Sequence, residues 1–468
     1  MNVQQLAQVI DYHYSAETRN RILGTLNPLL EADRRVYVVI DDDPTGGQTV
    51  HDIDVYTEWS QETLNQAVAE EARMFYIMTN SRSLSEQETT VVHQQLTHRL
   101  TKASQISGRQ YTLISRGDST LRGHYPLEVE LLQKNLQTSS KQLIIPYFRE
   151  GNRYTVGNVH YLKAGDSFIP VGESEFGHDK SFGYHSSDLT EWVEEKTAGQ
   201  ILRSEVDSIS LEMIRSLDFD AMERILCGDG KCIVVNATCD DDLRSFAVAY
   251  LHACQKGCCF VARTAAAWPR VIGHVSDQPL LESKQLVDQV STAGGLIVVG
   301  SHVSQTTRQF ECLLKALPQL RAIELNQHLV VQPEILAKEV ERVAQEASGA
   351  IRAGQTCVIF TRRERLDLNG TEEEELLMTQ RIADAVSGTV SAISAKPRFL
   401  LAKGGITSSS IATKALQITH ATIIGQIEPG VPVWMPTPES RYQKMPYIIF
   451  PGNVGSEDTL LHAVQKLI

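Results

Sequence analysis

The sequence has no apolar run approaching the ~18 residues of a membrane-spanning helix, so we expect no membrane span. Basic residues are also few, because 44 lysines and arginines face 57 acids and the formal net charge is -13. This balance argues against broad binding to the phosphate backbone of nucleic acid. The first residues contain neither a basic region nor an apolar signal core, so we expect a cytoplasmic protein.

Several cofactor motifs are missing. Without G-x-x-x-x-G-K-[ST] the chain is not a P-loop NTPase, and without G-x-G-x-x-G a dinucleotide-binding Rossmann site is unsupported. The H-R-D and D-F-G elements of protein kinases are missing too. The eight cysteines form no C-x-x-C pair, so buried reduced thiols are favoured over a zinc site.

The length of 468 residues exceeds what one hydrophobic core serves, and it predicts two or three domains. Residues 1–34 have helical periodicity and form an appendage packed on the first domain or on a partner subunit, so a homo-oligomer is one alternative. We predict a first domain over 35–277 and a second over 278–468, because the strand pattern is interrupted after residue 273.

The clearest signal is a short apolar run that ends in acids. Residues 36–40 are β-branched or aromatic without alternation, which is typical of a strand buried on both faces. Asp41, Asp42 and Asp43 follow, and then the turn residues 44–47. Ligands of open α/β sheets bind at the carboxyl ends of the strands, so these carboxylates are candidates for a binding site.

Three further strands end in polar loops. Residues 75–78 lead to Ser81 and Arg82, residues 111–114 to a loop at 115–124, and residues 143–145 to a loop that contains Arg153. The alternation of strands and helices predicts a parallel sheet whose loops converge on one edge. Arginine suits a carboxylate or phosphate, and aspartate suits sugar hydroxyls or general-base work. For the loop at 115–124, a solvated loop with internal salt bridges is the alternative.

The second domain contains three strand-loop-helix units with glycine in the loop. The loops begin at Gly300, Lys403 and Pro451. Glycines let backbone amides approach a polyphosphate, and the following helix N-terminus adds favourable partial charge. Three such loops, one with Lys403 and a hydroxyl-rich helix start, predict a nucleotide site.

These motifs resemble the four-carbon acid sugar kinase family. Residues 42–46 resemble its D-D-x-T-G, residues 118–123 its D-S-T-x-R-G, and residues 153–155 its R-x-T element. Gly300-Ser301, residues 404–407 and residues 452–455 match its ATP-binding segments. The sequence departs from the family pattern at Pro44, Gly47, Gln48, Arg116 and His124, which leaves the substrate open rather than the reaction class.

The resemblance implies a two-domain α/β fold with mostly parallel sheets flanked by helices and an active site in the cleft between the domains. The activity would be ATP-dependent phosphorylation of the terminal 4-hydroxyl of a four-carbon sugar acid such as a threonate, an erythronate or an oxo relative. The first domain would bind the acid and the second would bind ATP with Mg²⁺. The expected ATP-binding residues are Ser301, Gly404, Gly405, Ile406, Thr407, Gly452 and Asn453.

The remaining roles follow from in-line phosphoryl transfer. Arg82, Arg122 or Arg153 would bind the substrate carboxylate, and Asp43 or Asp118 would orient or deprotonate the hydroxyl, with Lys403 and Mg²⁺ offsetting phosphate charge. The further expected substrate contacts are Asp42, Thr45, Ser81 and Ser119. Two alternatives are a sugar-acid dehydrogenase, which the missing dinucleotide motif disfavours, and a catalytically silent sugar-acid-binding regulator, which would leave the glycine loops without a role.

Overall fold

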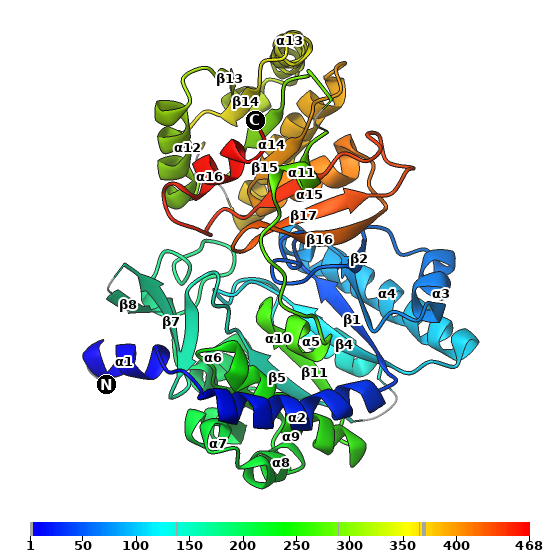
Figure 1. The fold of residues 1–468 in the computed structure, drawn as a ribbon, viewed down its shortest axis with the longest axis vertical. Coiled ribbons are helices and arrows are strands. Elements are labelled where there is room, and N and C mark those ends of the chain that lie inside the picture. The colour runs from blue at the N-terminus through cyan, green and yellow to red at the C-terminus, as the bar shows by residue number, and fades with distance from the viewer. Residues whose placement is uncertain (1–2, 137–138, 166, 289, 365, 367–370) are drawn as a thin grey trace. The chain divides into compact units, whose positions relative to one another are not determined.

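The computed structural model describes residues 3–136, 139–165, 167–288, 290–364, 366 and 371–468. The chain divides into two compact units, each treated by itself below and coloured along the chain in Figure 1. Unit 1 comprises Met1–Asp42 and Trp59–Ser276, and unit 2 comprises Asp43–Glu58 and Asp277–Ile468. The segment 43–58, which the sequence analysis grouped with the first range, thus belongs to unit 2.

Unit 1 is built on a parallel sheet, as the sequence predicts. The order of its strands is β3-β1-β4-β11-β5-β10-β9. Its strands are β1 (Val36–Asp41), β3 (Met74–Met78), β4 (Tyr111–Arg116), β5 (Lys141–Ile145), β9 (Val206–Ile209), β10 (Cys232–Val235) and β11 (Phe260–Thr264). Every residue of β1, β3, β10 and β11 is buried, so helices must cover both faces of the sheet. Because the strands are parallel, their carboxyl ends share one edge.

The helices of unit 1 include the N-terminal pair that the sequence predicts. They are α1 (Val3–Ile10), α2 (Ala16–Ala32), α3 (Gln61–Ala69), α4 (Glu86–Ser107), α5 (Leu127–Lys134), α6 (Leu189–Lys196), α7 (Leu211–Arg215), α8 (Phe219–Leu226), α9 (Asp240–Gln255) and α10 (Ala267–Ile272), with 3-10 turns η1 (Ser81–Ser83), η2 (Val171–Glu173) and η3 (Arg203–Glu205). Helix α2 packs along α9 (Figure 1). Arg19 Nε donates to Asp241 at 2.7 Å, and the Tyr14 hydroxyl donates to Asp242 at 2.9 Å. The N-terminal segment therefore packs on unit 1.

A small antiparallel sheet interrupts unit 1 between β5 and α6. It consists of β6 (Arg153–Val156), β7 (Val159–Ala164) and β8 (Ser167–Pro170). His160 of β7 is fully buried and lies 2.8 Å, through Nε2, from the carbonyl oxygen of Ser119. Its Nδ1 lies 2.9 Å from the Thr155 hydroxyl. An Nε2-protonated imidazole satisfies both contacts and fastens the small sheet to the loop after β4.

Unit 2 contains a second, mixed sheet in the order β13-β14-β12-β15-β18-β17-β16-β2. Its strands are β2 (Ile53–Tyr56), β12 (Leu296–Val299), β13 (Arg321–Leu325), β14 (Cys357–Thr361), β15 (Leu400–Lys403), β16 (His420–Glu428), β17 (Val431–Pro436) and β18 (Tyr447–Phe450). The run from β13 to β18 is parallel, whereas β17, β16 and β2 pair antiparallel. The three loops that the sequence singles out follow β12, β15 and β18, and they therefore share one edge of the sheet.

The helices of unit 2 enclose an aliphatic core around β12, β15 and β18. They are α11 (Ser283–Leu286), α12 (Ser304–Ala316), α13 (Pro333–Arg352), α14 (Glu372–Ala392), α15 (Gly405–Ser410) and α16 (Thr459–Gln465), with the 3-10 turn η4 (Gln327–Val331) and the π-helical turn η5 (Ile411–Ala415). Among the described residues, no helix of either unit is long and apolar enough to cross a bilayer.

The expectation of buried thiols holds for only part of the cysteines. Cys232 and Cys357 are buried in strands, but Cys227 is exposed and the remaining cysteines are partly exposed. Cys227 is the C-cap residue of α8, at a surface turn that continues through Gly228, Asp229 and Gly230.

His160 should make the free energy of unfolding depend on pH. Burial lowers the pKa of His160 to about 4, from a usual value of 6.5. Between these values the unfolded chain binds a proton that the folded chain excludes. The contribution of neutral His160 to the free energy of unfolding is complete above pH ~6.5. It falls by about 3 kcal/mol as the pH is lowered toward ~4. Denaturant unfolding of wild type and His160→Gln across this range should show the steeper loss in wild type; parallel curves would contradict the assignment.

Candidate functional site

The acids at the end of β1 are buried as ion pairs. Asp41 and Asp42 are each 2% exposed. Asp41 Oδ1 lies 3.1 Å from Arg116 Nη1, and Arg82 binds Asp42 through two hydrogen bonds, Nε to Oδ2 at 3.0 Å and Nη2 to Oδ1 at 2.6 Å. The predicted convergence of polar loops at this edge is therefore present in unit 1.

The register of the sheet brings these residues together. Asp41 is opposite Met78 of β3 on one side and Arg116 of β4 on the other. Beyond the strands, the Arg82 amide still donates to the Asp42 carbonyl at 3.3 Å, so the loop after β3 continues along the end of β1. The two arginines thus approach the acids from neighbouring strands.

The loop after β4 contains a third ion pair. Arg122 Nε donates to Asp118 Oδ2 at 2.7 Å, and the Thr120 hydroxyl donates to the same oxygen. Burial opposes ionisation of Asp118, but the charges of Arg122 and Arg82 hold its pKa well below the usual range. Asp118 is therefore a carboxylate at every physiological pH. Ser119, the next residue, is also buried.

Arg153 carries a buried charge without a counter-ion. Its side chain is 3% exposed, its Nε has no hydrogen-bond partner among the described residues, and no ion pair joins it to them. Its guanidinium lies 5.9 Å from the ring centre of Phe176, and the nearby charge of Asp118 favours its ionised form. Burial nevertheless lowers the pKa of Arg153 to about 10. An anion bound beside it would relieve this cost.

Two residues of this cluster escaped the sequence analysis. Arg263, at the end of β11, is 3% exposed and donates from Nη2 to the Arg122 carbonyl at 2.9 Å. A Cβ at Gly117 would lie 2.2 Å from Arg263 Nη1, so this glycine makes room for the guanidinium. Glu128 of α5 is buried and accepts a hydrogen bond of 2.5 Å from Ser81 Oγ. The position of Arg263 at the end of an apolar strand could have indicated it as a site residue. No feature of the sequence around Glu128 distinguishes it from other helical glutamates.

Asp43 and Thr45 lie in unit 2, apart from the other expected substrate contacts. The Thr45 amide donates to Asp43 Oδ1 at 2.7 Å. Asp43 Oδ2 faces Gly405, where a Cβ would lie only 2.0 Å from it. The carboxylate therefore contacts the glycine turn that opens α15, and a larger residue at 405 would displace it.

The three glycine loops of unit 2 converge around Ser301. A Cβ at Gly404 would lie 2.9 Å from Ser301 Cβ, and one at Gly452 would lie 2.8 Å from Ser301 Oγ. Gly404 has a φ of 118°, which a side chain would strain. Thr306 Oγ1 joins two of the loops by donating to the Gly452 carbonyl at 2.9 Å. Gly405, Ile406 and Asn453 are half-buried on these loops, and Thr407 is buried.

Lys403 is placed differently from the expectation that it faces a phosphate. Its side chain is fully buried, its ammonium donates to the Pro451 carbonyl at 2.9 Å, and it lies 3.9 Å from the ring centre of Phe450. Burial and the charge of Arg363 lower the pKa of Lys403 well below its usual value. In this structure it fastens the loop after β18.

Arg363, in the loop after β14, was not predicted. Its Nη2 donates to the Ser301 carbonyl at 2.6 Å and to Thr307 Oγ1 at 2.8 Å. Its Nε and Nη1 have no hydrogen-bond partner among the described residues. Gln327 fixes this loop by donating to the Arg362 carbonyl at 2.8 Å. Arg363 and Lys403 thus place two cations beside the glycine loops.

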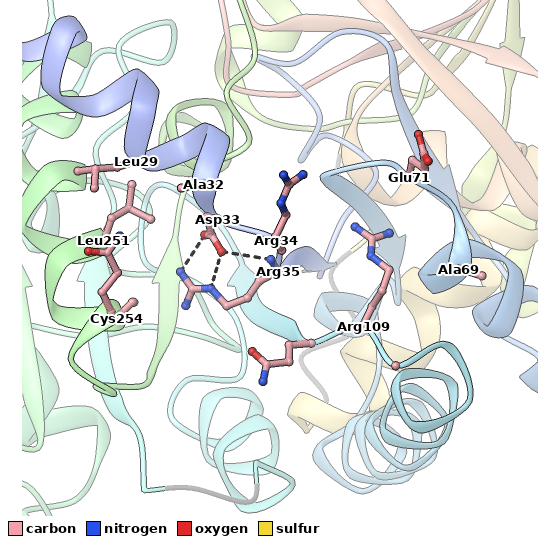
Figure 2. Close-up of a pocket in the computed structure, with 13 residues that line it drawn as sticks. Leu29, Ala32, Asp33, Arg34, Arg35, Ala69, Glu71, Arg109, Leu251 and Cys254 are labelled. Carbon is pink, nitrogen blue, oxygen red and sulfur yellow. Dashed lines mark hydrogen bonds and ion pairs between the residues drawn. The ribbon is translucent and has the colours of Figure 1, made fainter.

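A separate hollow of about 800 Å³ lies at the other end of β1 (Figure 2). Two of its three arginines are engaged: Arg35 pairs with Asp33 at 2.8 Å, and Arg109 donates to the Val68 carbonyl at 3.1 Å. It contains none of the residues that the sequence singles out. Among the described residues, no group of three or more histidine, cysteine, aspartate or glutamate side chains could hold a metal ion.

Comparison with known proteins assigns both units to a family. Residues 37–270 match a sugar-binding N-terminal domain, and residues 296–460 match a nucleotide-binding C-terminal domain. A search of curated proteins found no match.

Solved structures share the fold across 92% of this chain. A Salmonella typhimurium LT2 protein provisionally described as a tRNA synthase superposes with a TM-score of 0.63 at 15% identity over 99% of its own chain. A Haemophilus influenzae protein of family DUF1537 superposes with a TM-score of 0.58 at 17% identity over its full length. The two matched domains, in this order on one chain, identify it as a member of the four-carbon acid sugar kinase family.

Proposed function

We propose that this chain is an ATP-dependent kinase that phosphorylates the terminal 4-hydroxyl of a four-carbon sugar acid. The family provides a sugar-binding and a nucleotide-binding domain, which supports a transfer between these two ligands. The single observation that carries the choice of an acidic substrate is the buried charge of Arg153, which forms no ion pair with the described residues.

The charges at the edge of the unit 1 sheet support this reasoning. Asp41, Asp42 and Asp118 each pair with an arginine at this edge. Arg153 and Arg263 remain without an ion-pair partner among the described residues. A carboxylate on the substrate would supply the missing anion and accept hydrogen bonds from a planar guanidinium.

Of the three arginines proposed to hold the substrate carboxylate, we assign this role to Arg153. Arg82 is already bound to Asp42 by two hydrogen bonds, and Arg122 to Asp118 by one. The charge of each is therefore already matched by a buried aspartate, so a substrate carboxylate would gain less from either of them than from Arg153. The side chains of Asp118 and Ser119 would then contact sugar hydroxyls.

In unit 2, the loops around Ser301 would hold the nucleotide phosphates. Arg363 would donate its remaining N–H groups to phosphate oxygens, and Lys403 would act indirectly by holding the loop at Gly452. Asp43, in contact with the Gly405 turn, would orient or deprotonate the attacking hydroxyl. Mg²⁺ arrives with ATP and takes most of its ligands from phosphate and water, so one carboxylate such as Asp43 suffices. When bound, it would offset charge on the transferred phosphate.

The first test is release of ADP from ATP and Mg²⁺ with a panel of four-carbon sugar acids of both hands, and with five- and six-carbon acids as controls. We expect turnover with one four-carbon acid and none with the longer acids. Turnover with the longer acids alone would support the proposed kinase activity and contradict the proposed four-carbon substrate. Failure to bind ATP at millimolar concentration would instead favour the sugar-acid-binding regulator.

Replacing Arg153 should selectively weaken binding of the acid. A hydrogen-bonded charge of this kind is worth about 1.5–3 kcal/mol, so Arg153→Gln should raise KM for the sugar acid about 10- to 100-fold. The KM for ATP should stay unchanged. Arg149→Gln is the matched control, because Arg149 is exposed on the same loop. Steady-state kinetics test both variants, and equal KM values for wild type and Arg153→Gln would remove Arg153 from the site.

Replacing Arg363 should weaken binding of phosphates rather than of the adenosine group. For Arg363→Gln we expect a Kd for ATP and ADP at least about 10-fold higher, with adenosine binding unchanged. Arg362→Gln is the control, since Arg362 forms a surface pair with Glu324 at 3.0 Å. Calorimetric titration with the three ligands tests this. A loss of affinity shared by adenosine would show that Arg363 only holds the Ser301 loop.

A further inference from the structure

Two thiols of unit 1 lie in contact at the surface, away from the candidate site. Cys258 Sγ donates a hydrogen bond to Cys227 Sγ across 2.9 Å. Cys227 is exposed, and Cys258 is partly exposed. The two residues are 31 positions apart, so the contact is produced by the fold. Neither takes part in the proposed phosphoryl transfer.

The fold fixes both cysteines by independent elements. Cys227 caps the C-terminus of α8, where its amide donates to the Glu223 carbonyl at 2.8 Å. Cys258 lies in the turn between α9 and β11, where its amide donates to the Ala253 carbonyl at 3.0 Å. Helices α8 and α9 pack against one another. The thiols therefore meet because two rigid helix ends meet.

Two lysines give this pair a positive environment. Lys141 Nζ donates to the Leu226 carbonyl at 2.9 Å, one residue before Cys227, and its charge also acts on Cys258. Lys256 pairs with Glu223, and its ammonium interacts with the Cys227 sulfur. Burial and the neighbouring Cys227 sulfur raise the pKa of Cys258 to about 12, although the charge of Lys141 opposes this. Cys258 therefore keeps the proton that it donates, and the exposed Cys227 is the thiol that first meets a disulfide in solution. An exposed thiol with a neighbouring thiol in contact is the arrangement of a reversible redox pair.

We propose that Cys227 and Cys258 form a reversible disulfide with a low-molecular-weight disulfide such as oxidised glutathione. The Cys227 thiolate attacks one sulfur of glutathione disulfide, which forms a mixed disulfide and releases one glutathione thiolate. Cys258 then loses its proton and attacks the Cys227 sulfur, which forms the protein disulfide and releases the second glutathione thiolate. The two protein thiols are oxidised, and glutathione disulfide is reduced to two thiols.

We expect the disulfide to cross-link two elements at the amino-terminal edge of the unit 1 sheet. The bond would join the end of α8 to the start of β11 and constrain β10 and α9 between them. Such a cross-link stabilises mainly by restricting the unfolded chain. The candidate site lies at the opposite, carboxyl-terminal edge, so catalysis should be little affected.

Equilibration of the full-length protein in glutathione buffers of increasing oxidation tests the proposal. Intact mass should fall by two hydrogen atoms, and proteolytic mapping should find Cys227 linked to Cys258. The Tm should rise by several degrees and return after dithiothreitol. Cys227→Ser and Cys258→Ser should abolish the linkage and the Tm shift, while Cys312→Ser in unit 2 should keep both.

Three outcomes would overturn the proposal. They are glutathione adducts without an internal bond, a disulfide between two copies of the chain on a non-reducing gel, and oxidation that continues unchanged in Cys227→Ser. Because Cys227 is exposed, its serine variant should fold, and its circular dichroism spectrum checks this.

Discussion

The buried carboxylates at the edge of the unit 1 sheet are stable because nearby arginines neutralise them. Asp41 pairs with Arg116 at the end of β4, Asp42 with Arg82 after β3, and Asp118 with Arg122 in its own loop. Removing one partner of such a pair leaves an uncompensated buried charge, which typically costs about 3–5 kcal/mol. The electrostatics therefore fix the loop conformations as well as the charge of the site. An arginine left over from this pairing is consequently a better indicator of a ligand than any arginine within it.

The run of three aspartates, Asp41 to Asp43, is divided between the two units. Asp42 is the last residue of the chain's first passage through unit 1, and Asp43 is the first residue of unit 2. The Asp42 carboxylate is bound by Arg82, whereas that of Asp43 contacts the Gly405 turn. The two adjacent aspartates therefore lie in different environments, because the boundary between the units falls at the peptide bond between Asp42 and Asp43. In a kinase, this places a substrate-domain acid and a nucleotide-domain acid next to one another in sequence.

Much of the fold follows from local sequence signals, because a fully buried parallel strand needs an uninterrupted apolar run. The strands at 36–40, 75–78 and 296–299 were recognisable for this reason, and so was the helical N-terminus. The polar loops were recognisable too, since small and charged residues follow each strand. The assignment of 43–58 to unit 2 was not, because β2 pairs with β16, more than 360 residues away in sequence.

The parts of the site that sequence could not reveal depend on side-chain direction. Lys403 follows a strand and precedes two glycines, which is typical of a phosphate-binding lysine, yet its ammonium turns inward to Pro451. Arg263 and Arg363 each end or follow a strand whose loop carries no glycine motif, and only their unpaired nitrogen atoms distinguish them. The local sequence pattern therefore predicts at which edge of the sheet a residue lies, but not the direction of its side chain.

The structure also separates the two aspartates proposed as the base. A base works best when its pKa lies near the working pH, and the charges around Asp118 hold its pKa far below that range. Its Oδ2 is further engaged by Arg122 and Thr120, so protonation would disrupt both contacts. Asp118 is thus suited to binding a hydroxyl and unsuited to accepting its proton. Phosphoryl transfer demands little of a base and much of positioning. We therefore propose Asp43, whose carboxylate contacts the Gly405 turn, for this role.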